Sequence, residues 1–126
     1  TYIKGIQRNV IFLAIVIKEN GKHIGNIKIE GINYQNGRGD YGIMMGDKKE
    51  WGKGYAKEAS LAVIEHCFKK LNLRKITLGV LEDNINAVEL YKKIGFAVEG
   101  VLKKHSFYDG SYRNTILMAI FNPNFQ

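Results

Sequence analysis

The stretch "EWGKGYAKEA", from Glu50 to Ala59, places two glycines and a lysine directly before a run of good helix formers. Glycine has no Cβ, so a glycine-rich turn lets backbone N–H groups approach a ligand closely, and the helix behind it adds the positive end of its dipole. The pattern predicts an anion site, with an ordinary strand-to-helix turn as the alternative. It is not a Walker A loop, because no Ser or Thr follows Lys53.

A second stretch, "EDNINAVELYKKIGF" from Glu82 to Phe96, offers an amide and a phenol. Asn84 stands where a helix should begin, so its side chain can cap that helix or bond an amide of a ligand. Tyr91 follows seven residues later, two turns along the same helix face. Taken alone, each residue also has a structural interpretation, as an N-cap for Asn84 and as a core aromatic for Tyr91.

The rest of the sequence predicts the elements that must position these two stretches. Apolar runs bounded by turns such as Asn20-Gly21 and Asp109-Gly110 indicate strands. Apolar residues that recur every three or four positions indicate two helices, the second of which stops at Gly95. After a short polar lead, the sequence predicts a strand at 9–17, then a stretch at 18–32 that supplies the Asn20-Gly21 hairpin turn and a partner strand, and a strand at 40–46. A helix at 54–70, a strand at 74–81, a helix at 84–96, and strands at 96–108 and 111–121 follow.

This order of elements describes a mixed α/β fold whose first three strands form an antiparallel meander. The strands at 40–46 and 74–81 are separated by a helix, so they can pair in parallel through a crossover. Each then runs into a helix, which brings both helix N-termini to the carboxyl ends of the strands, where α/β sheets usually bind ligands. Together, the two stretches therefore favour a ligand site over two unrelated structural features.

Length and composition fit one globular domain, because 126 residues with 45% apolar and 25% charged side chains can build a single core. The longest apolar run, Val10–Ile17, is too short to cross a bilayer, and no charged leader opens the sequence, so a cytoplasmic location and no membrane partner are expected. Cys67 is the single cysteine, which excludes an intrachain disulfide, and we expect it in the core. The three histidines lack ligand spacing, so no metal site is predicted.

The net charge of +7 and a pI near 9.5 indicate a surface that attracts anions. Composition alone does not choose between a phosphorylated cofactor, a nucleotide substrate and RNA. The basic pairs, such as Lys48-Lys49 and Lys103-Lys104, lack the interleaved aromatic residues of an RNA-stacking surface. We therefore interpret them as solvated faces and do not expect nucleic acid as a partner.

The segments "WGKGYA" and "DNINAVELYKKIGF", separated by the strand "KITLGVL", resemble the GNAT superfamily of acetyl-CoA-dependent N-acetyltransferases. The tail "FYDGSYRNTILM" is similar to that of the RimJ/RimL and spermidine acetyltransferase branch, and the resemblance covers Phe12 to Phe121. It implies the GNAT acyl-CoA N-acyltransferase fold, a mostly antiparallel sheet with one parallel strand pair and flanking helices, over residues 1–126 as a single domain. Family members begin with a strand and two helices before the meander, so we expect an N-terminally incomplete domain here.

The resemblance also implies direct acetyl transfer from acetyl-CoA to a primary amine, with roles for individual residues. Tyr91 would be the general acid that protonates the departing thiolate. Asn84 would bond the pantetheine arm, and Lys93 would lie near the cofactor. Backbone groups would meet the pantetheine and thioester at Met44, Met45 and Gly46. The pyrophosphate would lie on Trp51, Gly52, Lys53, Gly54, Tyr55, Ala56 and Lys57. Trp51 stands where Gln or Arg is usual, so one side-chain phosphate contact is expected to be lost.

The general base and the acceptor stay open at this point. Some relatives carry a glutamate where this sequence has Gly79. A residue outside this sequence, bulk water, or one of four side chains acting through water could replace it: Glu30, Asp40, Glu82 or His105. The acceptors that we consider are a protein N-terminus, a polyamine and a nucleotide-linked amino sugar, and the net charge counts mildly against a polycation. The alternative function is a catalytically silent CoA-binding regulatory module, and a homodimer is a further expectation.

Overall fold

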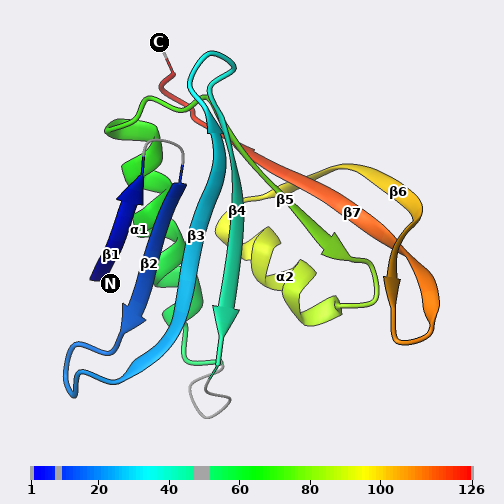
Figure 1. The fold of residues 1–126 in the computed structure, drawn as a ribbon, viewed down its shortest axis with the longest axis horizontal. Helices are drawn as coiled ribbons and strands as arrows, with labels where there is room; N and C mark the ends of the chain where they lie inside the picture. The colour runs from blue at the N-terminus through cyan, green and yellow to red at the C-terminus, as the bar shows by residue number, and fades with distance from the viewer. Residues whose placement is uncertain (1, 8–9, 47–51, 126) are drawn as a thin grey trace.

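A computed structural model describes residues 2–7, 10–46 and 52–125, with side chains from residue 10 onward (Figure 1). These ranges form one sheet of seven strands and two helices. The elements are β1 (Tyr2–Gln7), β2 (Val10–Val16), β3 (His23–Asn33), β4 (Arg38–Met45), α1 (Tyr55–Lys69), β5 (Lys75–Leu81), α2 (Ile85–Ile94), β6 (Ala97–Tyr108) and β7 (Ser111–Phe121). Neither helix has the combined length and apolar character needed to span a bilayer.

The N-terminal stretch corrects the predicted order of elements. We expected a polar lead before residue 9, but residues 2–7 form β1, which pairs antiparallel with β2 from Tyr2↔Ala14 to Gln7↔Val10. The outer edge of β2 carries backbone N–H and C=O groups that require partners, and a polar segment supplies them as well as an apolar one does. Because β1 is held by backbone pairing with β2, the pattern of apolar side chains in residues 2–7 did not predict it. The other predicted strands and both helices are confirmed close to their predicted ranges.

The strands follow the order β1-β2-β3-β4-β5-β7-β6, so that β7 lies between β5 and β6. The expected meander and the expected parallel pair are both present, since β3 is antiparallel to β2 and β4, and β4 is parallel to β5. The β4 and β5 strands pair over three positions only, from Arg38↔Lys75 to Asp40↔Thr77. Beyond Asp40 and Thr77 they diverge, as Figure 1 shows, and we call this opening the β4–β5 fork.

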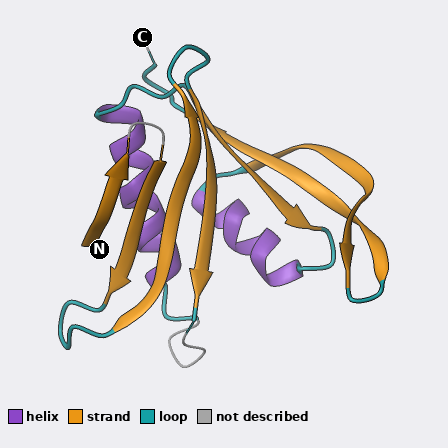
Figure 2. Cartoon of the chain, in the orientation of Figure 1, coloured by secondary structure: helices purple, strands orange, loops and turns teal. Residues whose placement is uncertain are grey.

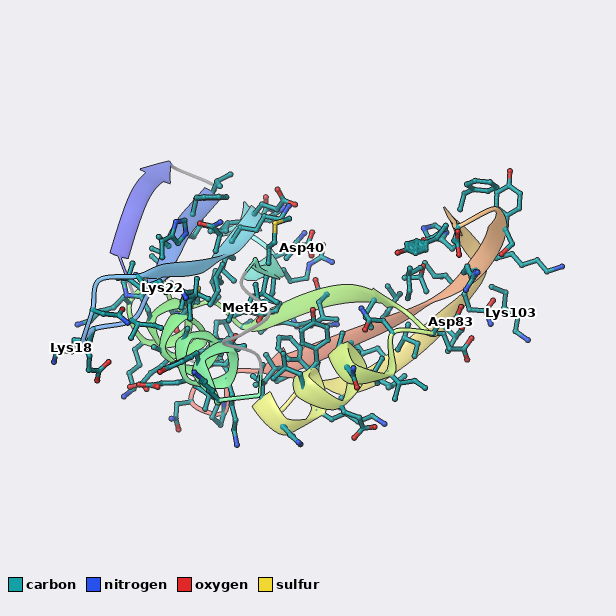
Figure 3. All side chains as sticks on the ribbon, turned by 90° about the horizontal axis from the view of Figure 1, so that it is seen from below. Lys18, Lys22, Asp40, Met45, Asp83 and Lys103 are labelled. Atoms are coloured by element: carbon teal, nitrogen blue, oxygen red, sulfur yellow. The ribbon has the colours of Figure 1, made fainter. Side chains whose placement is uncertain are left out.

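Both helices cover the same face of the sheet, which Figure 3 shows edge-on. Ile27 and Ile29 of β3 point into this core with no exposed surface, whereas Lys28 and Glu30 are exposed on the other face. Cys67 of α1 is fully buried, as expected, and burial raises the pKa of its thiol to about 12. Figure 2 shows that β4 leads into α1 and β5 into α2, so the chain enters each helix after the carboxyl end of one fork strand.

Candidate active site

The glycine-rich turn adopts a backbone conformation that only glycine enters at little cost. Gly52 and Gly54 have φ values of +81° and +85°, in the left-handed region. Chain neighbours aside, an ideal Cβ at either glycine would have no heavy atom of the described residues within 4 Å, so no described side chain fills the space beside them. Trp51, which the prediction placed at the start of this loop, lies outside the described residues. The conformation and the open space are what close approach of a ligand to the backbone requires.

The first turn of α1 presents backbone donors beside this loop. Gly54 is the N-cap and has no side chain to cap the helix, and the N–H of Glu58 donates to the Gly54 carbonyl at 3.0 Å. The amides of Tyr55, Ala56 and Lys57 therefore have no acceptor within the helix. With the positive end of the helix dipole, they form the kind of site that binds phosphate groups. The anion site at residues 52–57 stays a prediction with suitable local geometry.

The end of β4 brings two methionines to opposite faces of the sheet. Met44 is 71% exposed, whereas Met45 is partly buried and packs against the core on the helix side (Figure 3). The N–H of Gly46 donates to the Ile24 carbonyl of β3 at 3.0 Å. Because successive amides of a strand point to opposite edges, the Met45 amide is directed to the β4–β5 fork. The Met45 backbone is thus oriented toward the place where a thioester is expected.

The position of this strand end depends on Gly25, a residue that the sequence analysis did not select. Gly25 of β3 pairs with Met45, and an ideal Cβ on it would lie 2.5 Å from the Met44 carbonyl oxygen and 2.8 Å from the Met45 Sδ. Any larger residue would push the end of β4 away. An isolated glycine within an apolar strand pattern is the signal that could have revealed such a close approach.

Tyr91 of α2 lies beneath the fork among aromatic rings. Its ring contacts Tyr41 of β4 edge-on, with centroids 5.8 Å apart, and Phe96 with centroids 6.2 Å apart. Burial raises the pKa of the Tyr91 hydroxyl, so the phenol stays protonated at neutral pH. The hydroxyl has no hydrogen-bond partner in the described part of the chain. The ring of Tyr91 thus fits the structural interpretation as a core aromatic. Its hydroxyl forms no hydrogen bond with a described residue.

Asn84 begins α2, as predicted, and its side chain has a structural task. The Asn84 Oδ1 accepts a hydrogen bond from the Ala87 N–H at 3.3 Å, which confirms the N-cap interpretation. Its Nδ2 donates to no described residue and is therefore able to donate to a ligand as well. Lys93 lies exposed in the last turn of α2, nine residues along from this cap. Contact of either residue with a cofactor stays a prediction.

The four residues considered as a general base differ in their surroundings. Glu82 accepts a hydrogen bond from Asn114 at 2.7 Å, and Glu30 forms an ion pair with Lys28 at 3.0 Å. His105 lies on the exposed strand β6. Asp40 is hydrogen-bonded to Thr77 at the apex of the fork, which makes it the carboxylate that the pairing of β4 and β5 brings to the site. Gly79 lies on β5 beyond that apex and has no side chain to offer.

A groove of about 750 Å³ lies elsewhere, along the second half of α1, and no predicted site residue lines it. Its lining includes Leu61, which is 41% exposed. Among the described residues, no three His, Cys, Asp or Glu side chains are grouped as metal ligands. Of the predicted site residues that the structure describes, Lys93 lies apart in the last turn of α2, and the others lie at the fork or at the two helix entrances beside it.

Comparison with known proteins agrees with this geometry. Residues 2–97 match the acetyltransferase (GNAT) domain family. The spermidine N(1)-acetyltransferase of Escherichia coli strain K12 is 34% identical over 110 residues, or 87% of this chain, and the L-amino acid N-acetyltransferase AaaT of that strain is 36% identical over 80 residues, or 64%. The crystal structure of spermidine N-acetyltransferase from Vibrio cholerae in complex with CoA and spermine is similar with a TM-score of 0.86 and 28% identity, covering 94% of this chain and 69% of that one.

The chain spans 59% of the length of the E. coli spermidine N(1)-acetyltransferase and 49% of that of AaaT. The family match nevertheless extends from β1 to the start of β6, and so includes the glycine turn, Asn84 and Tyr91. Its agreement with the observed fold, including the single parallel strand pair next to two helix entrances, confirms the resemblance seen in the sequence. The chain therefore belongs to the GNAT acetyltransferase family.

Proposed function

We propose that this chain transfers an acetyl group from acetyl-CoA to a primary amine by direct attack in a ternary complex. The observation that carries the proposal is the β4–β5 fork with Tyr91 beneath it and two helix N-termini at its ends. Relatives with this domain are named as N-acetyltransferases, and the V. cholerae neighbour was crystallised with CoA.

Each part of the site has a task in this reaction. The amides at the start of α1 and the turn at Gly52 and Gly54 would bind the pyrophosphate, and the Asn84 amide would bond the pantetheine arm. The backbone N–H of Met45, directed to the fork, would stabilise the oxyanion. As the amine nitrogen attacks the thioester carbonyl, the carbon–sulfur bond breaks and the Tyr91 hydroxyl gives its proton to the departing sulfur. The proton lost by the amine passes to solvent or to a base.

The acceptor that we favour is a polyamine, with a protein N-terminus and an amino sugar as the other candidates. Relatives from Escherichia coli and Vibrio cholerae are named for spermidine, and the V. cholerae structure contains spermine. The net charge of +7 slows the encounter with a polycation, but binding depends on the local charges at the fork. AaaT is named for L-amino acids, so amino acids should also be tested as acceptors.

A homodimer also stays a prediction, and β6 is where we expect it to form. This strand is at the edge of the sheet and is exposed along most of its length, including Val98, Val101 and Phe107. An unpaired edge of this length with apolar side chains is typical of an interface, since it offers backbone groups and apolar area to a second copy.

A thiol-release assay tests the proposed function. The purified chain is mixed with acetyl-CoA and a panel of polyamines, peptides, amino acids and amino-sugar nucleotides, and free CoA and acetylated product are quantified. We expect amine-dependent release with an N-acetylated product. Binding of acetyl-CoA without any amine-dependent release would instead identify the regulatory module, and a lack of binding would reject both functions.

A further inference from the structure

The outer part of β5 depends on β7 for its position. β5 pairs with β4 only as far as Thr77, whereas its pairing with β7 continues to Leu81↔Thr115. Beyond the apex of the fork, β7 is therefore the one strand that pairs with β5 in the described part of the chain. The turn that follows β5 leads directly to Asn84 and the start of α2 (Figure 1). The contacts that hold this turn against β7 therefore also place Asn84.

Contacts from β7 continue past the end of the strand pair into this turn. The Glu82 N–H donates to the Asn114 carbonyl at 3.0 Å, and the Asn114 Nδ2 donates to Oε2 of Glu82 at 2.7 Å. The Arg113 guanidinium donates to Oδ2 of Asp83, and Figure 3 shows Asp83 beside the outer part of β7. Two consecutive residues of β7 thus hold two consecutive residues of the turn, and Asn84 is the next residue of the chain.

The side chains of Arg113 and Asn114 are themselves oriented by their neighbours. β6 makes a register shift opposite Asn114, where Lys104 has a φ of +49°, and the Lys104 N–H donates to Oδ1 of Asn114 at 2.9 Å. The Asn114 carboxamide therefore uses its oxygen on β6 and its nitrogen on the turn after β5. The Arg113 Nε donates to the Ser111 hydroxyl at 3.0 Å. Both side chains reach the turn from a defined direction.

These contacts fix a position more than they add stability. The Arg113 and Asp83 side chains are 31% and 58% exposed, and an ion pair so exposed contributes little to the free energy of unfolding. The Asn84 N–H donates to the Leu81 carbonyl at 3.0 Å, and its Oδ1 accepts from the Ala87 N–H. Because these bonds tie Asn84 to the turn and to the first turn of α2, a displacement of the turn would move its Nδ2 as well.

Asn84 is the residue proposed to bond the pantetheine arm of CoA, and a hydrogen bond to a ligand depends on distance and direction. We propose that Asn114, together with Arg113, is a positioning residue that holds the turn after β5 so that the Asn84 amide meets this arm. The inference rests on the proposed function. It predicts that a change on β7, at a residue to which we assign no contact with CoA, weakens binding of the arm and leaves binding of the pyrophosphate unchanged.

Exchange of the two hydrogen-bonding groups tests this role. Asn114→Asp keeps an oxygen that accepts from Lys104 but places a second carboxylate against Glu82, so the bond between the two side chains is lost. Adding Glu82→Gln restores a donor on the other side and the net charge of the parent, so the bond can form with its polarity reversed. Asn84→Ser keeps an N-cap oxygen and removes the amide nitrogen. Asn124→Asp makes the same substitution at an exposed residue of the groove along α1, and is the control for added charge.

Calorimetry compares CoA with ADP, which has a pyrophosphate but no pantetheine arm. We expect Asn114→Asp to lower the affinity for CoA about tenfold and to leave the affinity for ADP unchanged. Adding Glu82→Gln should restore most of the CoA affinity, and Asn124→Asp should change neither affinity. In the Asn84→Ser background, Asn114→Asp should have no further effect on CoA, because a residue that acts through another is not additive with it.

Equal losses for CoA and ADP, an additive loss in the Asn84→Ser background, or no recovery on adding Glu82→Gln would overturn the inference. Hydrogen exchange of the Glu82 and Asn84 amides without ligand reports on the turn itself. Faster exchange in Asn114→Asp supports the inference, and unchanged exchange rejects it. Because binding requires no acceptor, the result is separate from the thiol-release assay. The expected loss of CoA affinity supports the inference even in a chain that releases no thiol, and unchanged affinity rejects it even in a chain that does.

Discussion

Tyr41 and Tyr91 pack edge to face with ring centroids 5.8 Å apart, yet their hydroxyl groups have different surroundings. The Tyr41 hydroxyl is bonded to the buried Ser60 hydroxyl at 2.6 Å. The Tyr91 hydroxyl has no such partner in the described part of the chain. Burial raises the pKa of both phenols above the ordinary value. The Tyr41 hydroxyl is therefore bonded within the core, whereas the Tyr91 hydroxyl stays protonated at neutral pH without a partner among the described residues.

The pair predicts opposite effects of two Tyr→Phe changes. Tyr91→Phe keeps the ring contacts, so the free energy of unfolding should change by less than about 0.5 kcal/mol. Loss of the acid should lower kcat about 100-fold and leave the Kd of acetyl-CoA unchanged. Tyr41→Phe leaves the Ser60 hydroxyl without its partner and should lower the free energy of unfolding by about 1–3 kcal/mol. Its effect on kcat should be smaller than that of Tyr91→Phe. Urea unfolding and steady-state kinetics measure both, and a wild-type kcat in Tyr91→Phe would remove the acid role.

The glycine turn predicts a loss of acetyl-CoA affinity when a charged side chain replaces Gly54. Gly54→Glu places a negative charge beside the expected pyrophosphate and strains a residue with φ of +85°. Gly54→Asn is the matched control, because Asn tolerates positive φ and carries no charge. Calorimetry should show acetyl-CoA affinity reduced about tenfold or more in Gly54→Glu, and less in Gly54→Asn. Similar losses in both variants would indicate strain in place of charge repulsion, and no loss would contradict the anion site.

Gly25 predicts an indirect effect on the site through the backbone of β4. Gly25→Ala adds a Cβ that would overlap the Met44 carbonyl oxygen and the Met45 sulfur, so the end of β4 must shift at a cost of about 1–3 kcal/mol. KM for acetyl-CoA should rise because the Met45 amide moves with the strand. Gly100→Ala, at a position with nothing within 4 Å of the added Cβ, should change neither stability nor KM appreciably. Equal KM values for both variants and the parent would show that the strand end does not orient the thioester.

The sequence predicted most of the fold because side-chain patterns and turn residues carry local information. Ile27 and Ile29 alternate with exposed residues along β3, Asn84 caps α2 as expected, and Gly54 lies directly before α1. These features each depend on neighbours within a few residues of the chain. The same information is sufficient to place the glycine turn and Tyr91 on their elements.

Features that depend on partners distant in the sequence could not be read in this way. The strand β1 exists through backbone pairing with β2, and the position of β7 between β5 and β6 depends on the order of the whole sheet. Asp40 is one of four candidate bases in the sequence, and only the pairing of β4 with β5 shows that it lies at the fork. Gly25 became relevant only when its contact with the end of β4 was known.

Cys67 predicts how stability depends on pH. Its pKa is about 12 in the folded chain, against an ordinary value of 9.0, because burial disfavours the thiolate. The unfolded chain therefore loses this proton above pH 9 while the folded chain keeps it, so stability falls as pH rises from 9 toward 12. Between pH 8 and pH 10 the loss from this group should be about 1.4 kcal/mol.

Urea unfolding of the parent chain and of Cys67→Ala at pH 8 and pH 10 measures this contribution. The variant is expected to be less stable at both pH values, because it loses buried contacts, so the pH dependence is compared and not the absolute stability. Tyr41 and Tyr91 titrate in both proteins, and their contributions cancel in the comparison. The loss of stability between pH 8 and pH 10 should be about 1.4 kcal/mol smaller in Cys67→Ala. An equal loss in both proteins would mean that the thiol reaches solvent in the folded chain, which contradicts its place between α1 and the sheet.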